Sequence, residues 1–256
     1  MLPKTLRRTP PLLVAGCVLF FLSAYFTVRF PDVPGASLGS FIDTFLIAVP
    51  SVLALFRWIG ARRAVLSVLA LSIFAYAIET TGVATGFPYG EFRYGEALGP
   101  KAFGLVPYLL PVSHLPLVLG AVGAAGGGRI VSRTLKAAVL LVALDAVLDP
   151  GAVRLGFWEY VEGGFYYGVP LSNYLGWLLS GAMGAAVLLL VGRPRGVAPP
   201  GLLDSSIIAV AFWVGVAVFT GLVLPALFGM VLFLFLLLRR ASLAATKPRI
   251  ADGEAV

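Results

Sequence analysis

Long runs of apolar residues, separated by short polar or basic segments, dominate the chain. A helix needs about 20 mostly apolar residues to cross a bilayer core of roughly 30 Å. The runs predict an all-α polytopic membrane protein, with residues 1–256 forming a single integral membrane domain. Seven runs approach the required length: Leu12–Val28, Phe41–Phe56, Ala64–Ile78, Leu105–Val122, Leu135–Leu148, Asn173–Val191 and Ser206–Leu238.

Basic residues between the runs predict the orientation of the spans, because cytoplasmic loops are enriched in lysine and arginine. The last run is too long for one ordinary span, and a turn near Gly221–Pro225 would divide it into two. We therefore predict eight spans, or seven if the last run crosses once, with both termini in the cytoplasm. The basic residues assigned to the cytoplasmic face are Lys4, Arg7, Arg8, Arg57, Arg62, Arg63, Arg129, Arg133, Lys136, Arg193, Arg195, Arg239, Arg240, Lys247 and Arg249.

Two polar segments interrupt this apolar pattern, at residues 79–104 and 145–177. They hold seven of the twelve acidic residues and most of the tyrosines. The predicted topology puts both segments on the non-cytoplasmic side of the membrane. We expect the functional site to lie there, because they contain most of the groups able to do polar chemistry.

Composition narrows the class of protein further. Hydrophobic residues make up 59% of the chain and charged residues 12%, with a mean hydropathy of +0.97, which excludes a water-soluble globule. The isoelectric point near 9.8 reflects the orientation of the spans, and no basic face for nucleic acid is evident. The basic tail at residues 239–256 is predicted to be cytoplasmic, and the expected location is the plasma membrane of a prokaryote. A single cysteine excludes an intramolecular disulfide.

Asp145 and Asp149 are the strongest candidates for chemistry. They are four residues apart near the outer end of a predicted span, so both point to one helical face. Carboxylates inside a span are costly and usually functional or paired, and burial of such a pair makes a general acid available at neutral pH. In the alternative interpretation, Pro150 ends the helix, Asp149 belongs to an interfacial loop and Asp145 bonds a neighbouring span.

A third carboxylate and the single histidine also lie in or next to predicted spans. Glu79 closes the third predicted span, where it is either functional or paired with an arginine such as Arg93 or Arg154. His114 lies among three prolines, in a span that must bend, and either lines the site or bonds a freed carbonyl.

The surroundings of Glu79 and Asp149 resemble each other in sequence. Glu79-x3-Val83-x2-Gly86-Phe87 matches Asp149-x3-Val153-x2-Gly156-Phe157 without gaps. A duplicated pair of spans would place the two carboxylates at equivalent positions, although a match this short also arises by chance.

Aromatic residues concentrate in the second polar segment. Such residues form interfacial belts in membrane proteins, but here they alternate with glycines, as in segments that line a pocket. An aromatic wall can also stabilise a cationic intermediate. The residues are Trp158, Tyr160, Phe165, Tyr166, Tyr167, Tyr174 and Trp177.

Several enzyme classes are excluded by what the sequence lacks. A single histidine cannot form a histidine-box di-iron site, and the glycines near residues 120–128 do not have dinucleotide-loop spacing. Two classes of function remain. One is acid–base chemistry on an apolar substrate, without cofactor or metal, and the other is a non-catalytic role.

Motifs in both polar segments resemble a known family. They are Gly86-Phe87-Pro88-Tyr89-Gly90-Glu91-Phe92-x-Tyr94, Asp145-x3-Asp149-Pro150-x-Ala152-Val153, Gly156-Phe157-Trp158 and Tyr166-Tyr167-Gly168-Val169-Pro170-x2-Asn173-x2-Gly176-Trp177. They are similar to the carotenoid-biosynthesis membrane family that includes CruF-type carotenoid 1,2-hydratases. The resemblance implies that water is added across the terminal C1–C2 double bond of an acyclic carotenoid end, such as that of lycopene, gamma-carotene or bisanhydrobacterioruberin.

Hydrating this alkene requires an acid to protonate C2, a stabilised cation at C1 and delivered water. We expect Asp145 or Asp149 to be the proton donor, and the other carboxylate or Glu79 to orient the water. The expected partners are a carotenoid in the bilayer and other membrane enzymes of its pathway, with no nucleic acid. The residues expected to bind substrate, with Trp158, Tyr89 and Tyr166 shielding the cation, are Tyr89, Gly90, Glu91, Tyr94, His114, Trp158, Tyr166, Asn173 and Trp177.

Two other functions remain open at this point. Asp145-x3-Asp149 in an eight-span protein also resembles intramembrane prenyltransferases, which bind magnesium and a diphosphate through two Asp-rich segments, of which one is present. A non-catalytic carotenoid-binding or transport protein would use the polar segments as a gate.

Overall fold

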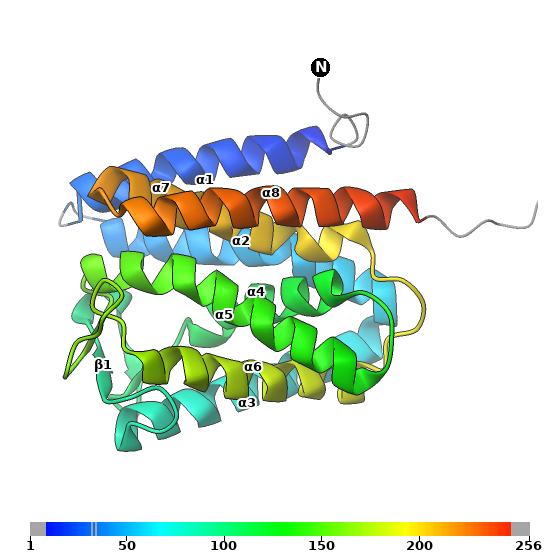
Figure 1. Ribbon diagram of the computed structural model, residues 1–256, viewed down its shortest axis with the longest axis horizontal. Coiled ribbons are helices and arrows are strands. Elements are labelled where there is room, and N and C mark those ends of the chain that lie inside the picture. Colours follow the sequence, from blue (N-terminus) through cyan, green and yellow to red (C-terminus); the bar gives the residue numbers. More distant parts are fainter. Residues whose placement is uncertain (1–8, 32, 34, 247–256) are drawn as a thin grey trace, which may run out of the picture.

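In the part of the chain that the structure describes, eight α-helices pack side by side and run alternately in opposite directions (Figure 1). The computed structural model describes residues 9–31, 33 and 35–246. Within this part of the chain the helices are α1 (Pro11–Arg29), α2 (Ala36–Ile59), α3 (Ala61–Thr85), α4 (Leu110–Ala125), α5 (Ile130–Arg154), α6 (Leu171–Gly192), α7 (Asp204–Thr220) and α8 (Val223–Ala245).

The ends of the bundle agree with the predicted up-and-down order. The start of α1 and the end of α8 lie at one end of the molecule, and β1 (Phe92–Tyr94) lies at the other (Figure 1). Both polar segments therefore belong to the end opposite the start of α1 and the end of α8. Lys4, Arg7, Arg8 and the tail beyond residue 246 lie outside the described residues.

Among the described residues, six helical segments are long and apolar enough to cross a membrane. They are Pro11–Arg29, Leu38–Ile59, Ala61–Thr85, Leu171–Gly192, Pro200–Thr220 and Val223–Ala245. Together with the helical architecture, they define an all-α polytopic membrane protein. Helix α4 has only 16 residues and α5 carries several charged side chains, so the count of eight spans and the cytoplasmic termini stay predictions.

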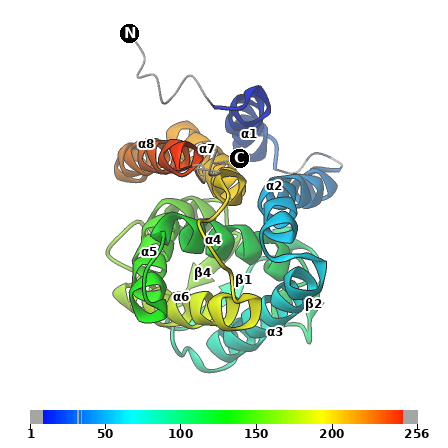
Figure 2. The same ribbon diagram turned by 90° about the vertical axis from the view of Figure 1, so that its right-hand side faces the viewer.

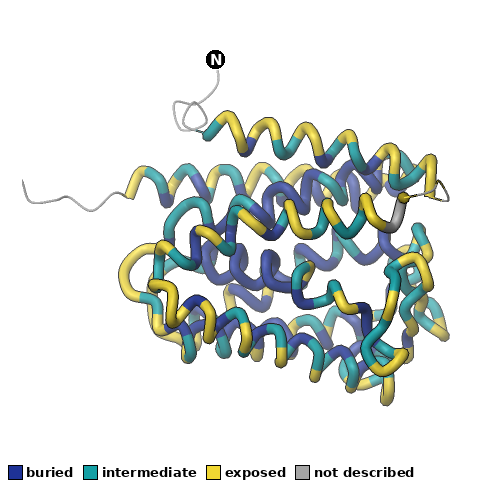
Figure 3. The backbone as a smooth tube through the Cα atoms, turned by 180° about the vertical axis from the view of Figure 1, so that it is seen from behind, coloured by how far each residue is buried: buried dark blue, intermediate teal, exposed yellow. Residues whose placement is uncertain are grey.

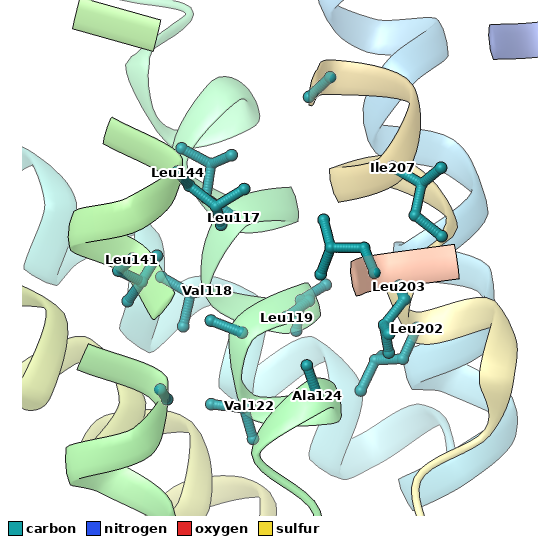
Figure 4. Close-up of a cluster of buried hydrophobic side chains, with 14 of the residues drawn as sticks. Leu117, Val118, Leu119, Val122, Ala124, Leu141, Leu144, Leu202, Leu203 and Ile207 are labelled. Atoms are coloured by element: carbon teal, nitrogen blue, oxygen red, sulfur yellow. The ribbon is translucent and has the colours of Figure 1, made fainter. Parts of the chain in front are cut away.

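The interior of the bundle is built around α4 (Figure 2). Its Val118, Leu119 and Val122 are fully buried, and Leu141 of α5 and Leu202 near the start of α7 pack into the same cluster (Figure 4). Exposed residues lie mainly on the outer faces of the peripheral helices (Figure 3). Many of them carry large apolar side chains. A surface rich in apolar side chains is expected where lipid, and not water, surrounds the helices.

The last apolar run is divided into α7 and α8, as its length predicts. Gly221 ends α7 with φ of 75°, and the Leu222 amide bonds the Ala217 carbonyl at 2.8 Å. Glycine adopts this left-handed conformation at little cost, so it can end the helix and reverse the chain.

Short strands order the two polar segments. Strand β1 pairs antiparallel with β4 (Trp158–Tyr160), so that Phe92 faces Tyr160 and Tyr94 faces Trp158. Strands β2 (Lys101–Ala102) and β3 (Val106–Pro107) form a second pair, and a 3₁₀ turn covers Glu96–Leu98. Because β1 follows α3 and β4 follows α5, the pairing ties together the two segments with similar sequences.

Helix boundaries differ from the predictions at both carboxylate positions. Glu79 does not close its helix, since α3 continues to Thr85. In the alternative interpretation, the end of the helix at Pro150 is wrong, because α5 continues through it to Arg154. Packing of this segment against neighbouring helices outweighs the local cost of an internal proline. The other part of that interpretation, a bond between Asp145 and a neighbouring helix, is confirmed by the hydrogen bond from Asn173 of α6. The fourth helix begins at Leu110 and not at Leu105, because Val106 and Pro107 pair in β3.

Candidate active site

A cavity of about 210 Å³ lies among the helices near the polar segments. Its wall is mostly apolar, with a few polar side chains, as expected for a site that binds an apolar small molecule. Eight of the residues predicted from sequence line it: Glu79, Tyr89, Tyr94, His114, Asp149, Trp158, Asn173 and Trp177.

Three carboxyl groups from two helices are buried here. Glu79 of α3 and Asp149 of α5 line the cavity and are 5% and 2% exposed. Asp145, one turn before Asp149, is fully buried and lies behind the wall. Glu79 also interacts electrostatically with Asp149. Among the described residues, none of these three carboxylates forms an ion pair. The predicted pairing of Glu79 with Arg93 or Arg154 is therefore wrong, and Arg93 pairs with Glu159 instead.

Asn173 joins the two aspartates. Its side-chain amide donates to Asp145 Oδ2 at 2.7 Å and to Asp149 Oδ2 at 2.6 Å. Asn173 is 1% exposed and belongs to the first turn of α6, so the aspartates of α5 are held from a neighbouring helix. Buried carboxyl groups require such donors, because no water replaces them.

Two tyrosines hold the cavity-lining carboxylates from the strand pair. Tyr94 of β1 donates to Glu79 Oε2 at 2.7 Å, and Tyr160 of β4 donates to Asp149 Oδ2 at 2.9 Å. Burial, followed by the charge of the bonded carboxylate, raises the pKa of both phenols, so they remain neutral donors. Each carboxylate is therefore bonded by a tyrosine from the strand that follows its own helix.

Close helix packing places Tyr89 in the wall. The ring of this residue, 2% exposed, lies against Gly82 of α3 and Gly176 of α6. A Cβ at Gly82 would come within 2.8 Å of the ring, and one at Gly176 within 2.5 Å. Only glycine permits this approach, which explains why glycine occurs at these positions.

His114 and Trp177 form a stacked pair beside Tyr89. The imidazole and indole planes are 27° apart and their centroids 5.7 Å apart, and Tyr89 lies 6.4 Å from the same indole. His114 is 3% exposed, and its Nε2 has no hydrogen-bond partner among the described residues. The interpretation in which His114 bonds a freed carbonyl is therefore wrong for Nε2.

Three predicted substrate-binding residues do not line the cavity. Gly90 lies against Ser172 at the start of α6. Glu91 is exposed, and its carbonyl accepts from the Val161 amide at 2.9 Å, continuing the strand ladder. Tyr166 packs against Tyr174 in a separate aromatic cluster. Their direct contact with substrate stays a prediction.

The structure adds residues that sequence reasoning did not assign to the site. The sequence identified Tyr160 only as one of several aromatic residues in the second polar segment. The pairing of β1 with β4 brings its hydroxyl to Asp149. Asp43 of α2 also lines the cavity. A lone carboxylate inside an apolar run was the signal that could have identified it.

Within the part of the chain that the structure describes, no three histidine, cysteine, aspartate or glutamate side chains form a group able to hold a metal ion. The carboxylate oxygens instead accept from Asn173, Tyr94 and Tyr160.

Fold and cavity together define a polytopic α-helical membrane protein with buried carboxyl groups facing an apolar pocket. The model of the carotenoid biosynthesis protein family matches residues 36–236, from the start of α2 to within α8. The chain belongs to this family, as the motifs in the polar segments indicated.

A curated relative gives a more specific comparison. Over 191 residues the chain is 45% identical to the bisanhydrobacterioruberin hydratase of Haloarcula japonica, a match that covers 69% of this chain. The chain spans 63% of the length of that relative, which is less than two thirds. No solved structure matches the chain.

Proposed function

We propose that the protein adds water across the terminal C1–C2 double bond of an acyclic carotenoid end, giving a tertiary 1-hydroxy group. One observation carries the proposal. Two buried aspartates on one helical face, joined by Asn173, adjoin an apolar cavity through Asp149. The name of the similar hydratase supports the same reaction class.

Asp149 is the proton donor in this proposal. Two carboxyl groups this close, without a basic partner, cannot both be ionised at reasonable cost, so Asp145 and Asp149 together hold a proton. Asp149 delivers the proton to C2 because it lines the cavity, whereas Asp145 lies behind it. The amide of Asn173 stabilises the charge that remains after transfer.

The cavity wall stabilises the cation that forms at C1. Trp158 packs edge-on against Tyr94, with centroids 5.9 Å apart, and both line the cavity beside Tyr89 and Trp177. Aromatic faces attract a cation and exclude bulk water from it. Glu79, held by Tyr94, orients the attacking water.

The depth of the cavity suits the end of a long polyene. Glu79 lies six residues before the end of α3, and Asp149 lies five residues before the end of α5. At 1.5 Å per residue, both lie about 8–9 Å inside the helix ends. A forty-carbon polyene is about as long as the hydrocarbon core is thick, so its end group would lie at this depth.

Expression in a bacterium that accumulates lycopene tests the proposal. We expect extracted pigment to gain the mass of one water, with the chromophore spectrum retained. Asp149→Asn should abolish the gain, and Glu159→Gln, which changes an exposed carboxylate on β4, should leave it unchanged. Failure to hydrate lycopene, gamma-carotene and bisanhydrobacterioruberin, with the protein present in the membrane, would overturn the proposal. A magnesium-dependent prenyl transfer or bound, unmodified pigment would establish one of the two alternatives.

Plasma-membrane location and association with other carotenoid-pathway enzymes are parts of the same proposal. The substrate is lipid-soluble, so an integral membrane enzyme meets it without release into water. Cell fractionation and co-purification from the native host test these two points.

A further inference from the structure

His114 is a polar group that the proposed reaction has not yet used. It belongs to α4, lines the same cavity as Asp149 and Glu79, and is 3% exposed. Its Nε2 is buried without a hydrogen-bond partner among the described residues. An unpaired buried nitrogen is costly, so this position favours a small polar molecule that can bond it.

The imidazole is held in place by its neighbours. Its ring stacks on Trp177 and lies 6.5 Å from the Phe74 ring. Trp177 follows Asn173 by one turn of α6, so the helix that positions the two aspartates also positions the histidine ring. No carboxylate among the described residues forms an ion pair with His114, so nothing there favours its charged form before reaction.

The two carboxylates that the proposed reaction uses are already engaged, and Tyr89 Oη, which also has no hydrogen-bond partner among the described residues, belongs to a phenol, a much weaker base than imidazole. Glu79 accepts from Tyr94, and Asp149 accepts from Tyr160 and Asn173. His114 differs because Nε2, in the tautomer that carries its proton on Nδ1, offers a free lone pair.

We propose that His114 Nε2 binds the attacking water and accepts its proton, and is therefore a catalytic base of the hydration. This inference rests on the proposed function. It assigns the two proton transfers to two different groups. The aspartate pair gives a proton to the alkene, and the histidine takes one from water.

The step balances without any further reactant. The π electrons of the C1–C2 bond take the proton from Asp149 and form a C–H bond at C2, which leaves a cation at C1. A lone pair of the water forms the C–O bond at C1, and one O–H bond breaks as its proton passes to Nε2. The imidazolium then returns that proton to the aspartate pair, which restores the starting state.

Deuterium labelling separates these two transfers. Purified protein in lipid vesicles would be given lycopene in D₂O buffer, and both the product and the recovered lycopene would be examined by mass spectrometry. The wild-type chain should give hydroxylated product with one non-exchangeable deuterium at C2. Failure of the wild-type chain to hydrate any carotenoid end would count against the proposed function, and not against the role of His114 in particular.

His114→Phe keeps a ring against Trp177 but removes both nitrogens. We expect hydration to fall about a hundredfold or more, as for loss of a general base. The cation should still form and lose a proton, so recovered lycopene should acquire deuterium at its ends. Asp149→Asn should show neither hydration nor deuterium uptake.

His114→Ala gives a second measurement, because added imidazole can occupy the vacated space. Partial recovery of hydration by imidazole is the expected result. Wild-type hydration rates in His114→Phe would overturn the proposal. So would loss of deuterium uptake together with hydration in His114→Phe, with no rescue of His114→Ala, because the histidine would then serve the structure of the site and not the water.

Discussion

Tyr160 donates a 2.9 Å hydrogen bond to Asp149, eleven residues before it in the chain. The contact exists because β4 folds back over the end of α5 and pairs with β1. Tyr94 of β1 bonds Glu79 in the same way. The strand pair thus fixes the orientation of Glu79 and Asp149.

Removing the Tyr160 hydroxyl should slow proton donation by Asp149 while the aromatic ring stays in place. Tyr160→Phe keeps the ring and deletes one hydrogen bond to a carboxylate, which is worth about 1.5–3 kcal/mol. We expect the hydration rate to fall about tenfold or more, measured by pigment conversion at equal protein level. Tyr108→Phe, at an exposed side chain, is the control, and equal rates in the two variants would contradict the prediction.

Asn173→Leu should affect stability as well as activity. Leucine has the same branched shape but leaves two buried aspartates without their shared amide donor. We expect a loss of about 1–3 kcal/mol in the free energy of unfolding, measured by titration with a denaturing detergent. Ser172→Ala, which removes one bond to the Tyr89 carbonyl at 3.1 Å, should cost less. A stable Asn173→Leu protein would show that the aspartates find other partners.

Gly176→Ala tests the close approach of Tyr89 to α6. The new methyl group would come within 2.5 Å of the tyrosine ring and 2.8 Å of the Pro88 carbonyl oxygen. Tyr89 must then move into the cavity, and we expect loss of carotenoid binding and about 1–3 kcal/mol of destabilisation. Gly127→Ala meets no atom within 4 Å and serves as the control. Normal pigment retention by Gly176→Ala would mean that the ring does not shape the site.

Arg240 and Asp204 form a pair at the opposite end of the bundle, far from the proposed chemistry. Arg240 Nε lies 2.5 Å from Asp204 Oδ1, and the arginine is 8% exposed. Arg240→Met should cost about 3 kcal/mol, because it leaves a mostly buried carboxylate unpaired, and hydration per folded molecule should not change.

The double variant Arg240→Met with Asp204→Leu provides the matched comparison. It should recover much of the lost free energy of unfolding, since neither partner is then left alone. Lys101→Met, at the other side of the molecule, breaks a pair with an exposed glutamate and should cost about 1 kcal/mol or less. A double variant no more stable than Arg240→Met would contradict this account.

The predicted orientation in the membrane can be tested with single cysteines in a Cys17→Ser background. A membrane-impermeant maleimide applied to intact cells should label Glu162→Cys, at an exposed position of the second polar segment. It should label Arg195→Cys only after the membrane is permeabilised. The reverse pattern would place the polar segments in the cytoplasm.

Sequence patterns predicted the helices well, because apolar length and basic flanks are properties of each segment alone. The division of the last run at Gly221 and the shared face of Asp145 and Asp149 followed from the same local rules. Helix ends were less predictable: α5 continues through Pro150, since packing against other helices stabilises a turn that the proline alone would disfavour.

The composition of the site was only partly predictable. Glu79, Asp149, Asn173 and His114 were identified because polar groups in or beside apolar runs are conspicuous. The roles of Tyr94 and Tyr160 as donors were not, because they depend on the register of two strands far apart in the chain.

By itself, the sequence determined that this protein is a bundle of membrane helices and that its two polar segments lie at one end. The i, i+4 spacing also determined that Asp145 and Asp149 share a helical face, whatever surrounds them. Tertiary structure alone decided that Asn173 joins them, that Glu79 lies near Asp149, and that the ring of His114 stacks on Trp177. The physical reason is that such contacts depend on how each helix is rotated about its axis and how closely it packs against its neighbours. Small residues such as Gly82 and Gly176 permit the close packing, because the Tyr89 ring lies directly against them.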